Sequence, residues 1–257
     1  MSFIDWIYSS YPNPGINGQW GWLHIVTLIV CIVLIVGLTF LFRKRSEKAR
    51  RIVLWVLVSL ILVFEISRRV INFCKTTDYS WQNVLYILFP RPWCAIACWT
   101  IIFAAIFNKK FFYNFASMTA LICALIFFAY PGVGFNNQYI LFENLYSICT
   151  HSLILVTSIL LITLKFTKFE YKTIWKETIY YAIILAYCLI EIYVLKIEAD
   201  PMYFMPGNDV QEILGVSYGL YLPLYIVFML VYFNIFYLID DRKNVFKRKT
   251  KRKNQTA

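Results

Sequence analysis

Charged residues are scarce in this chain: Asp, Glu, Lys and Arg make up only 15% of its 257 residues, and histidine occurs twice. Two histidines are too few for a His-rich metal site, and the loops do not supply the ligands of a Cys/His zinc site. The sequence also lacks a Cys-x-x-Cys pair, a Walker motif, a haem or flavin signature and an internal repeat typical of inverted-repeat transporters. We therefore expect no metal, nucleotide or redox cofactor.

Apolar residues are abundant instead. Hydrophobic residues make up 60% of the chain and the mean hydropathy is +0.63. They come in runs of roughly 20 residues, the length that crosses about 30 Å of hydrocarbon. The pattern predicts an all-α polytopic membrane protein, a bundle of seven transmembrane helices. The predicted spans are Trp20–Phe42, Ile52–Phe73, Pro92–Phe107 (whose outer end could reach back to Val84), Phe111–Tyr130, Tyr139–Leu164, Thr178–Leu195 and Val216–Ile239.

The lysines and arginines predict the orientation. They gather at residues 43–51, 109–110 and 165–176 and after Asp240, in every second loop and the C-terminal tail. The positive-inside rule places these segments in the cytoplasm, so the N-terminus is expected outside and the C-terminus inside. Residues 1–19 lack a basic start and are rich in Trp, Tyr and Pro, which predicts an interfacial segment rather than a signal peptide. Residues 20–240 would then form the membrane domain and 241–257 a basic cytoplasmic tail.

The net charge of +11 follows from this topology. Basic loops next to a membrane attract anionic lipid, which we expect as a partner at the cytoplasmic face. The basic tail has no interleaved aromatic platform of the kind that binds single strands, so no nucleic-acid partner is expected. The predicted location is the cell membrane, with multiple passes.

Two reactive side chains fall inside predicted spans. Cys94 follows Pro90 and Pro92 at the head of the third span, where the free N–H groups of a helix start favour a thiolate. Cys98 lies one turn further along the same face. His151 is the only histidine well inside a span, and it shares a helical stripe with Glu143 and Ser147. Since spans three and five enter from the same side, the spacing predicts a Cys94–His151 pair at comparable depth, the minimum equipment for nucleophilic acyl chemistry.

The charged residues within the spans lie in the same outer half of the bilayer. Charges cost about 2.5 to 3.5 kcal/mol each at the centre of a membrane helix, so several at one depth predict a shared polar cavity. Glu65, Arg68 and Arg69 occupy one face of the second span, either as an ion pair that holds the bundle together or with one arginine on a lipid phosphate. The remaining candidates are Arg91 for a phosphate, Glu143, Glu191 or Glu65 for orienting His151, and His24 for lining the site.

Several short motifs carry a family resemblance. They are Pro90-Arg91-Pro92-Trp93-Cys94, Phe142 to His151, Trp22-Leu23-His24 and Asp200-Pro201-Met202-Tyr203-Phe204. In these segments the chain resembles the YwaF family of bacterial integral membrane proteins. That family is related to a eukaryotic membrane phospholipid acyltransferase family with a proposed Cys/His catalytic pair. The resemblance implies that Cys94 and His151 form such a pair, with a phospholipid or lysolipid as substrate.

The function expected from these features is acyl transfer or acyl hydrolysis on a membrane lipid, with Cys94 as nucleophile and His151 as base. Two other classes of function stay open. A substrate-binding or transport component would use the same intramembrane charges as a pathway for a small or lipidic ligand. A non-enzymatic seven-helix scaffold would explain the topology, but it gives no role to the thiol, the imidazole or the arginines.

Overall fold

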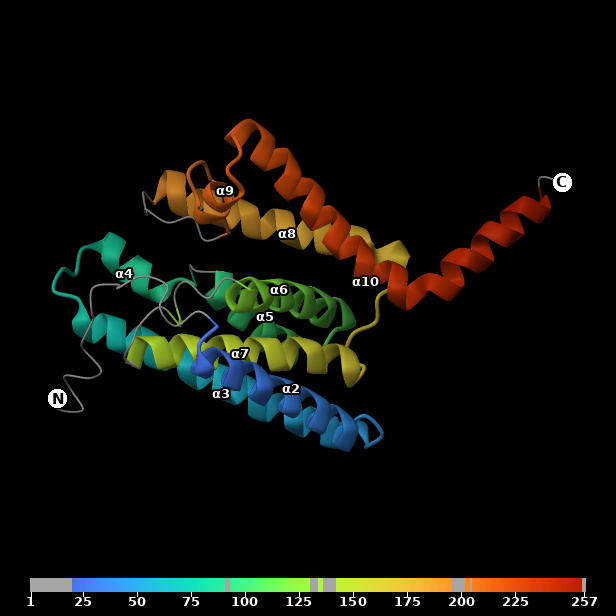
Figure 1. Cartoon of the computed structure of the whole chain (residues 1–257), viewed down its shortest axis with the longest axis horizontal. Coiled ribbons are helices and arrows are strands. Elements are labelled where there is room, and N and C mark those ends of the chain that lie inside the picture. Colours follow the sequence, from blue (N-terminus) through green and yellow to red (C-terminus); the bar gives the residue numbers. More distant parts are fainter. Residues whose placement is uncertain are drawn as a thin grey trace. The chain divides into compact units, whose positions relative to one another are not determined.

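A computed structural model describes residues 20–90, 93–129, 134–135, 142–195, 202–203 and 205–255. The expected interfacial segment 1–19 lies outside these residues. Throughout the described ranges the regular secondary structure is helical (Figure 1). Contacts divide the chain into two units, Met1–Thr167 and Lys168–Ala257.

The first unit is a bundle of helices. It contains α2 (Trp22–Phe42), α3 (Glu47–Lys75), α4 (Trp81–Leu88), α5 (Trp93–Phe107), α6 (Lys110–Ala129) and α7 (Phe142–Thr163). The neighbours α5, α6 and α7 pack on one another, while α3 packs on α5 and α7 and α2 packs on α7. Small residues let α5 and α6 approach closely, as in other membrane helices. The fully buried alanines are Ala95, Ala97, Ala104, Ala116, Ala120 and Ala124.

Helix α2 packs on α7 through a few small polar side chains. Cys31 contacts the Ser152 hydroxyl, and the Thr39 and Thr163 hydroxyls are 2.9 Å apart. Because the contact moves forward along both helices, α2 and α7 run in the same direction (Figure 1). The rest of α2 is apolar and mostly exposed, as expected of a helix that faces lipid.

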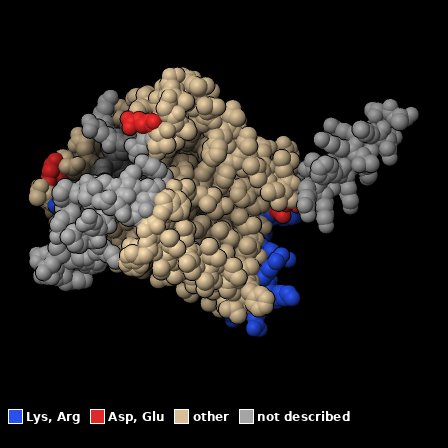
Figure 2. Space-filling view, in the orientation of Figure 1, with Lys and Arg blue, Asp and Glu red and all other residues tan. Residues whose placement is uncertain are grey.

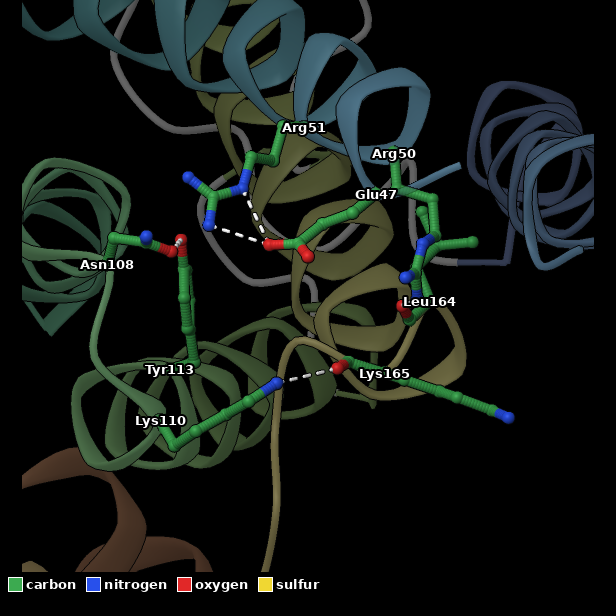
Figure 3. A network of polar contacts seen from close by, with 8 residues as sticks. All are labelled: Glu47, Arg50, Arg51, Asn108, Lys110, Tyr113, Leu164 and Lys165. Atoms are coloured by element: carbon green, nitrogen blue, oxygen red, sulfur yellow. Dashed lines mark hydrogen bonds and ion pairs between the residues drawn. The ribbon is translucent and has the colours of Figure 1, made fainter. Parts of the chain in front are cut away.

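Two cations close the C-terminal end of α7. The Arg50 guanidinium of α3 donates to the Leu164 carbonyl at 2.5 Å, and the Lys110 ammonium of α6 donates to the Lys165 carbonyl at 2.9 Å (Figure 3). Carbonyls at a helix end have no partner within the helix and carry partial negative charge, so cations stabilise them. These contacts join α3, α6 and α7 at the end of the unit that carries the basic loops.

Lysine and arginine side chains gather at the end of the first unit where α2 passes into α3 (Figure 2). Ser46 caps α3 by accepting from the Ala49 N–H, and Glu47 accepts from Arg51 at 2.7 and 3.0 Å. The hydrogen bond and positive charge of Arg51 lower the pKa of Glu47 below its usual value. The predicted accumulation of basic residues at this end is therefore present on the surface of the unit.

The second unit comprises a 3₁₀ turn η1 (Tyr171–Thr173), α8 (Ile174–Leu189), a π-helical turn η2 (Ile190–Val194), α9 (Asp209–Leu214) and α10 (Tyr218–Gln255). Helices α8 and α10 pack on each other, with the Tyr181 and Tyr225 hydroxyls 2.6 Å apart. The Asp240 carboxylate accepts from the Phe169 N–H at 3.0 Å, which ties the start of this unit to α10. α10 runs on without a break through residues expected to form a tail after Asp240.

Every predicted span coincides with a helix, and five helices of the described chain are long and apolar enough to cross a membrane. These are α2, α6, α7, α8 with its flanking turns, and α10 up to Asp240. The other two differ for physical reasons: α3 carries four charged residues in its second half, and α5 has only 15 residues. The third span does not reach back to Val84 as one helix, because α4 ends at Leu88 before Pro90 and α5 begins at Trp93. The protein is thus an all-helical, multi-pass membrane protein.

Candidate functional site: a thiol, an imidazole and a buried ion pair

Cys94 lies in the first turn of α5, where its surroundings are those predicted for a helix start. The backbone N–H groups of Cys94 and Ala95 point at its sulfur, and the side chain is partly exposed. N–H groups at a helix start carry partial positive charge and favour an anion at this position. Cys98, one turn later, is completely buried. Burial of the sulfur opposes a negative charge more strongly than these donors favour one, and of the two thiols only Cys94 has both partial exposure and such donors.

Glu65 of α3 is the centre of a buried ionic cluster. Its carboxylate is 1% exposed and accepts from the Arg69 Nη1 at 2.6 Å, with the Arg68 Nη2 at 3.6 Å. The Tyr146 hydroxyl of α7 donates to its other oxygen at 3.2 Å. A buried carboxylate needs such partners because the interior cannot solvate its charge. Glu65, Arg68 and Arg69 therefore lie on one face of α3, as predicted. Tyr146, which the sequence analysis did not identify, joins this face to α7.

Arg69 and Arg68 have different environments. Arg69 also donates to the backbone carbonyls of Glu65 and Leu88 at 2.9 and 3.1 Å, and it lies 5.4 Å from the centre of the Trp99 ring. It thereby fixes the end of α4 against α3. Arg68 makes the longer contact to Glu65, and its Nε is buried without a hydrogen-bond partner among the described residues. Arg69 also has a buried donor without a partner, its Nη2, so the two arginines differ in how firmly Glu65 and Leu88 hold them: Arg69 makes the short contacts and Arg68 only the longer one.

Arg68 is also the group that links the two reactive side chains. Its charge interacts with the Cys94 thiol on α5 and with the His151 imidazole on α7. Helix α6 gives the same neighbourhood independently, because Cys123 interacts with Cys94 while Phe127 stacks on His151. Residues four apart lie on one face of a helix. Cys94 and His151 thus each lie near one of two residues spaced four apart on α6, and whether the two form a pair stays a prediction.

The imidazole of His151 is held in a defined tautomer. Its Nδ1 lies 2.8 Å from the backbone carbonyl of Ser147, and a carbonyl only accepts, so Nδ1 carries the proton. Nε2 then holds a lone pair and is available as a base. The ring lies flat on Phe127, with centroids 3.7 Å apart and planes 6° from parallel. A backbone carbonyl and an aromatic ring, rather than a carboxylate, orient this histidine.

Two of the acidic partners expected for His151, Glu143 and Glu65, lie in the same unit and make no contact with it among the described residues. Glu143 is exposed near the start of α7, and the Glu65 carboxylate is occupied by the arginines and Tyr146. Glu191 is buried in η2 of the second unit, where Tyr187 donates to it at 2.8 Å. The physical reason is that Nδ1, the nitrogen such a carboxylate would take, already donates to its own helix. Arg91 lies outside the described residues.

His24 is buried at the head of α2, and its ring differs from His151 in tautomer. Its Nδ1 accepts from the Trp20 N–H at 3.2 Å, which places the proton on Nε2. The ring stacks on Phe135 with centroids 4.5 Å apart, and Phe135 in turn contacts Phe127. His24 is therefore joined to the site through aromatic rings and is not in direct contact with Cys94 or the arginines among the described contacts. In the described ranges, no group of three or more His, Cys, Asp or Glu is placed to hold a metal ion.

The sequence analysis did not identify several groups that lie around the candidate site: Tyr146, Phe127, Cys123 and the Ser147 carbonyl. An aromatic ring or a backbone carbonyl in an apolar helix has no distinctive pattern, because such residues also face lipid or fill a core. The only usable signal was the spacing of Ser147 and His151, which places the carbonyl of one within reach of the side chain of the other. The partners on other helices depend on how the helices are rotated against each other.

Comparison with known proteins corrects the family assignment. No curated protein and no solved structure matches the chain significantly. A family model matches over residues 19–240, nearly the whole helical region, and it describes the TMEM164 family. The resemblance to the YwaF family is therefore wrong; its motifs are only a few residues long, too short to separate one family of apolar helices from another. The chain belongs to the TMEM164 family.

Proposed function

We propose that this protein is a membrane-embedded enzyme that transfers or hydrolyses the acyl chain of a phospholipid or lysolipid. One observation carries the proposal: a thiol at a helix start and an imidazole with its Nε2 free as a base lie in the neighbourhood of one arginine. Thiol and imidazole are the nucleophile and base of acyl-enzyme chemistry. A guanidinium beside them suits a phosphate, because it presents several donors in one plane.

The first half of the reaction forms a thioester. The Cys94 thiol gives its proton to Nε2 of His151, and the sulfur attacks the ester carbonyl of the lipid. The carbon–sulfur bond forms, the ester carbon–oxygen bond breaks, and the imidazolium returns the proton to the departing alkoxide. The N–H groups of Cys94 and Ala95 offset part of the cost that burial imposes on the sulfur anion during the attack.

The second half releases the acyl chain. The hydroxyl of an acceptor lipid gives its proton to Nε2 and attacks the thioester, and the expelled thiolate takes the proton back from the imidazolium. Water in place of the lipid gives hydrolysis by the same steps. Neither half needs a metal or a redox cofactor. The neutral imidazole is suited to both proton transfers, because Ser147 keeps its other nitrogen protonated throughout.

Arg68 is assigned to the substrate phosphate. Its Nε is buried without a partner in the described structure, and a buried donor without a partner is costly. A phosphate oxygen would satisfy it. Arg69 fits this task less well, because the Glu65 carboxylate and the Leu88 carbonyl hold it in place, although its Nη2 is also buried without a partner among the described residues.

The proposal includes a topology of seven spans in the cell membrane, with the N-terminus outside, the C-terminus inside and anionic lipid at the basic loops. Its support is the gathering of lysine and arginine at one end of the first unit. Impermeant thiol reagents test it on intact cells, in a Cys74→Ser background that removes one exposed native thiol. A cysteine at Asp78 should be labelled and one at Lys48 should not. Labelling of both from outside would refute this topology.

The catalytic proposal is tested with purified protein and a phospholipid whose acyl chain is isotopically labelled. Cys94→Ser and His151→Ala should each reduce transfer steeply, and the double variant should be scarcely worse than either, since residues of one catalytic unit are not additive. Cys98→Ser is the matched control, one turn away and fully buried. If Cys98→Ser is inactive and Cys94→Ser is not, the nucleophile is misassigned; if neither change matters, the thioester mechanism is wrong.

A thiol-directed lipid electrophile separates this proposal from the transporter and scaffold alternatives. An enzyme of the proposed kind should react at Cys94 in preference to Cys98, and His151→Ala should slow that reaction. A scaffold gives His151 no influence over the thiol. Equal labelling of parent and His151→Ala would favour the alternatives.

A further inference from the structure

The orientation of the His151 ring depends on a contact outside its own helix. Phe127 lies flat on the imidazole at a centroid distance of 3.7 Å, and the Ser147 carbonyl holds Nδ1 at 2.8 Å. The carbonyl limits how far the ring swings, and the stacked phenyl ring limits its tilt. Both constraints are needed to aim Nε2, because one hydrogen bond leaves rotation about its own axis free.

Gly134 in turn lies close to the tip of the Phe127 ring. A Cβ atom built on Gly134 would lie 2.4 Å from Cζ and 2.9 Å from Cε2 of Phe127, far inside the 3.4 Å at which ordinary contact begins. The phenyl ring is 7% exposed, so little space is open to it. Glycine is therefore required here for close approach rather than for its backbone freedom. The tip of the Phe127 ring therefore lies against Gly134, and a face of the same ring lies on the His151 imidazole.

The turn that carries Gly134 is anchored at two points. Asn144, buried on α7, directs its amide at the Gly134 carbonyl at 3.4 Å, and Phe135 is buried against His24 of α2. Phe135 also contacts Phe127, with ring centroids 5.7 Å apart. Gly134 is thus tied to α7 and Phe135 to α2, and both contact Phe127.

We propose that Gly134, Phe135 and Phe127 form an aromatic clamp that positions the His151 imidazole for proton transfer. The clamp residues are positioning residues, since they act through His151. The inference rests on the proposed function for its catalytic consequence, but the orientation of the ring is measurable without any activity. The orientation of the ring and its effect on catalysis are therefore tested separately.

The main variant is Gly134→Ala. Adding a Cβ must displace the Phe127 ring by about 1 Å to restore ordinary contact, and a misplacement of that size costs catalytic steps roughly 100-fold. We expect kcat to fall roughly 10- to 100-fold with KM nearly unchanged, since substrate binding does not involve the clamp. Gly37→Ala is the matched control: it is the same substitution in the same unit, with no atom within 4 Å of the new Cβ.

The independent readout is nuclear magnetic resonance of protein labelled only at histidine. The chain has two histidines, and their opposite tautomers distinguish the ring nitrogen signals: Nδ1 is protonated in His151 and Nε2 in His24. Carbon-bound protons of His151 should show the upfield shift of a ring stacked on phenyl. Gly134→Ala should change this shift, and Gly37→Ala should not.

Phe127→Leu covers the case in which Gly134→Ala does not fold, because it removes the stacked ring without adding bulk. It should abolish the upfield shift and lower kcat. Unchanged histidine signals in a folded Gly134→Ala or Phe127→Leu variant would overturn the clamp. If the signals change as expected but Cys94→Ser remains fully active, the clamp is correct and the proposed function is wrong. If the signals change, kcat does not, and Cys94→Ser is inactive, the clamp has no role in positioning the base.

Discussion

Replacing Arg69 by glutamine should destabilise the fold, while the same change at the adjacent Arg68 should not. Arg69→Gln removes an ion pair of 2.6 Å to a carboxylate that is 1% exposed, together with the hydrogen bond to the Leu88 carbonyl. Removing one partner of a buried pair costs about 3 to 5 kcal/mol. Glu65 keeps Tyr146 and Arg68 as partners, so the loss should not exceed this range.

Arg68→Gln removes only a contact of 3.6 Å from a side chain that is 21% exposed, so about 1 kcal/mol or less is expected. The assay is thermal unfolding in detergent, followed by size-exclusion chromatography. On the scale of soluble domains of this size, Arg69→Gln should lower the midpoint by roughly 6 to 20 °C and Arg68→Gln by no more than a few degrees.

The same two variants separate stability from substrate binding. Arg68→Gln should weaken phospholipid binding by about 1.5 to 3 kcal/mol, roughly 10- to 150-fold, if the arginine donates to the phosphate. The reasoning is refuted if Arg69→Gln is as stable as the parent, or if Arg68→Gln aggregates. In the second case both arginines serve the ion pair, and the phosphate has another partner.

Two further predictions concern the ends of helices. Arg50→Met should cost about 1.5 to 3 kcal/mol of stability by leaving the Leu164 carbonyl without its cation, whereas Lys48→Met, an exposed position in the same turn of α3, should cost almost nothing in the same unfolding assay. Lys168 and Lys172 lower the pKa of Glu170 to about 2, chiefly through the hydrogen bond from Lys168, so its stabilising effect should be complete above about pH 4.3 and disappear as the pH falls toward 2. Comparison of parent and Glu170→Gln unfolding midpoints across that range checks the sign: a difference that grows on acidification would contradict it.

The sequence predicted those parts of the structure that depend on a single helix. Each predicted apolar run overlaps a helix, although the short helices α4 and α9 were not predicted, and the spacing of Glu65 and Arg69 predicted an ion pair that is present at 2.6 Å. Cys94 in a first helical turn followed from the preceding prolines. In each case the decisive interaction joins residues at most four positions apart, so no knowledge of helix packing was needed.

Interactions between helices could not be predicted in the same way. In lipid, an apolar helix has no polar face that marks its exposed side, so its rotation is set by detailed packing rather than by pattern. The contact of Tyr146 with Glu65 and the stack of Phe127 on His151 both depend on that rotation. For the same reason the sequence shows the acidic residues of a helix but not which of them, if any, faces a neighbouring imidazole.

The charges around Glu65 do not balance, and this leads to a last prediction. Two guanidiniums face one carboxylate, so the three groups sum to +2 − 1 = +1. An excess charge in a membrane interior is costly, about 2.5 to 3.5 kcal/mol at the centre of a span, and an anion brought to Arg68 would lower that cost. A phospholipid offers such an anion and a diacylglycerol does not. The parent should therefore bind phospholipid about 1.5 to 3 kcal/mol more tightly than a diacylglycerol with the same chains, and Arg68→Gln should bind the two nearly equally. Competition binding in detergent micelles measures both differences. The same preference for phospholipid in parent and Arg68→Gln would place the phosphate elsewhere, whereas loss of the preference in Arg68→Gln but not in Lys48→Met would assign it to this guanidinium.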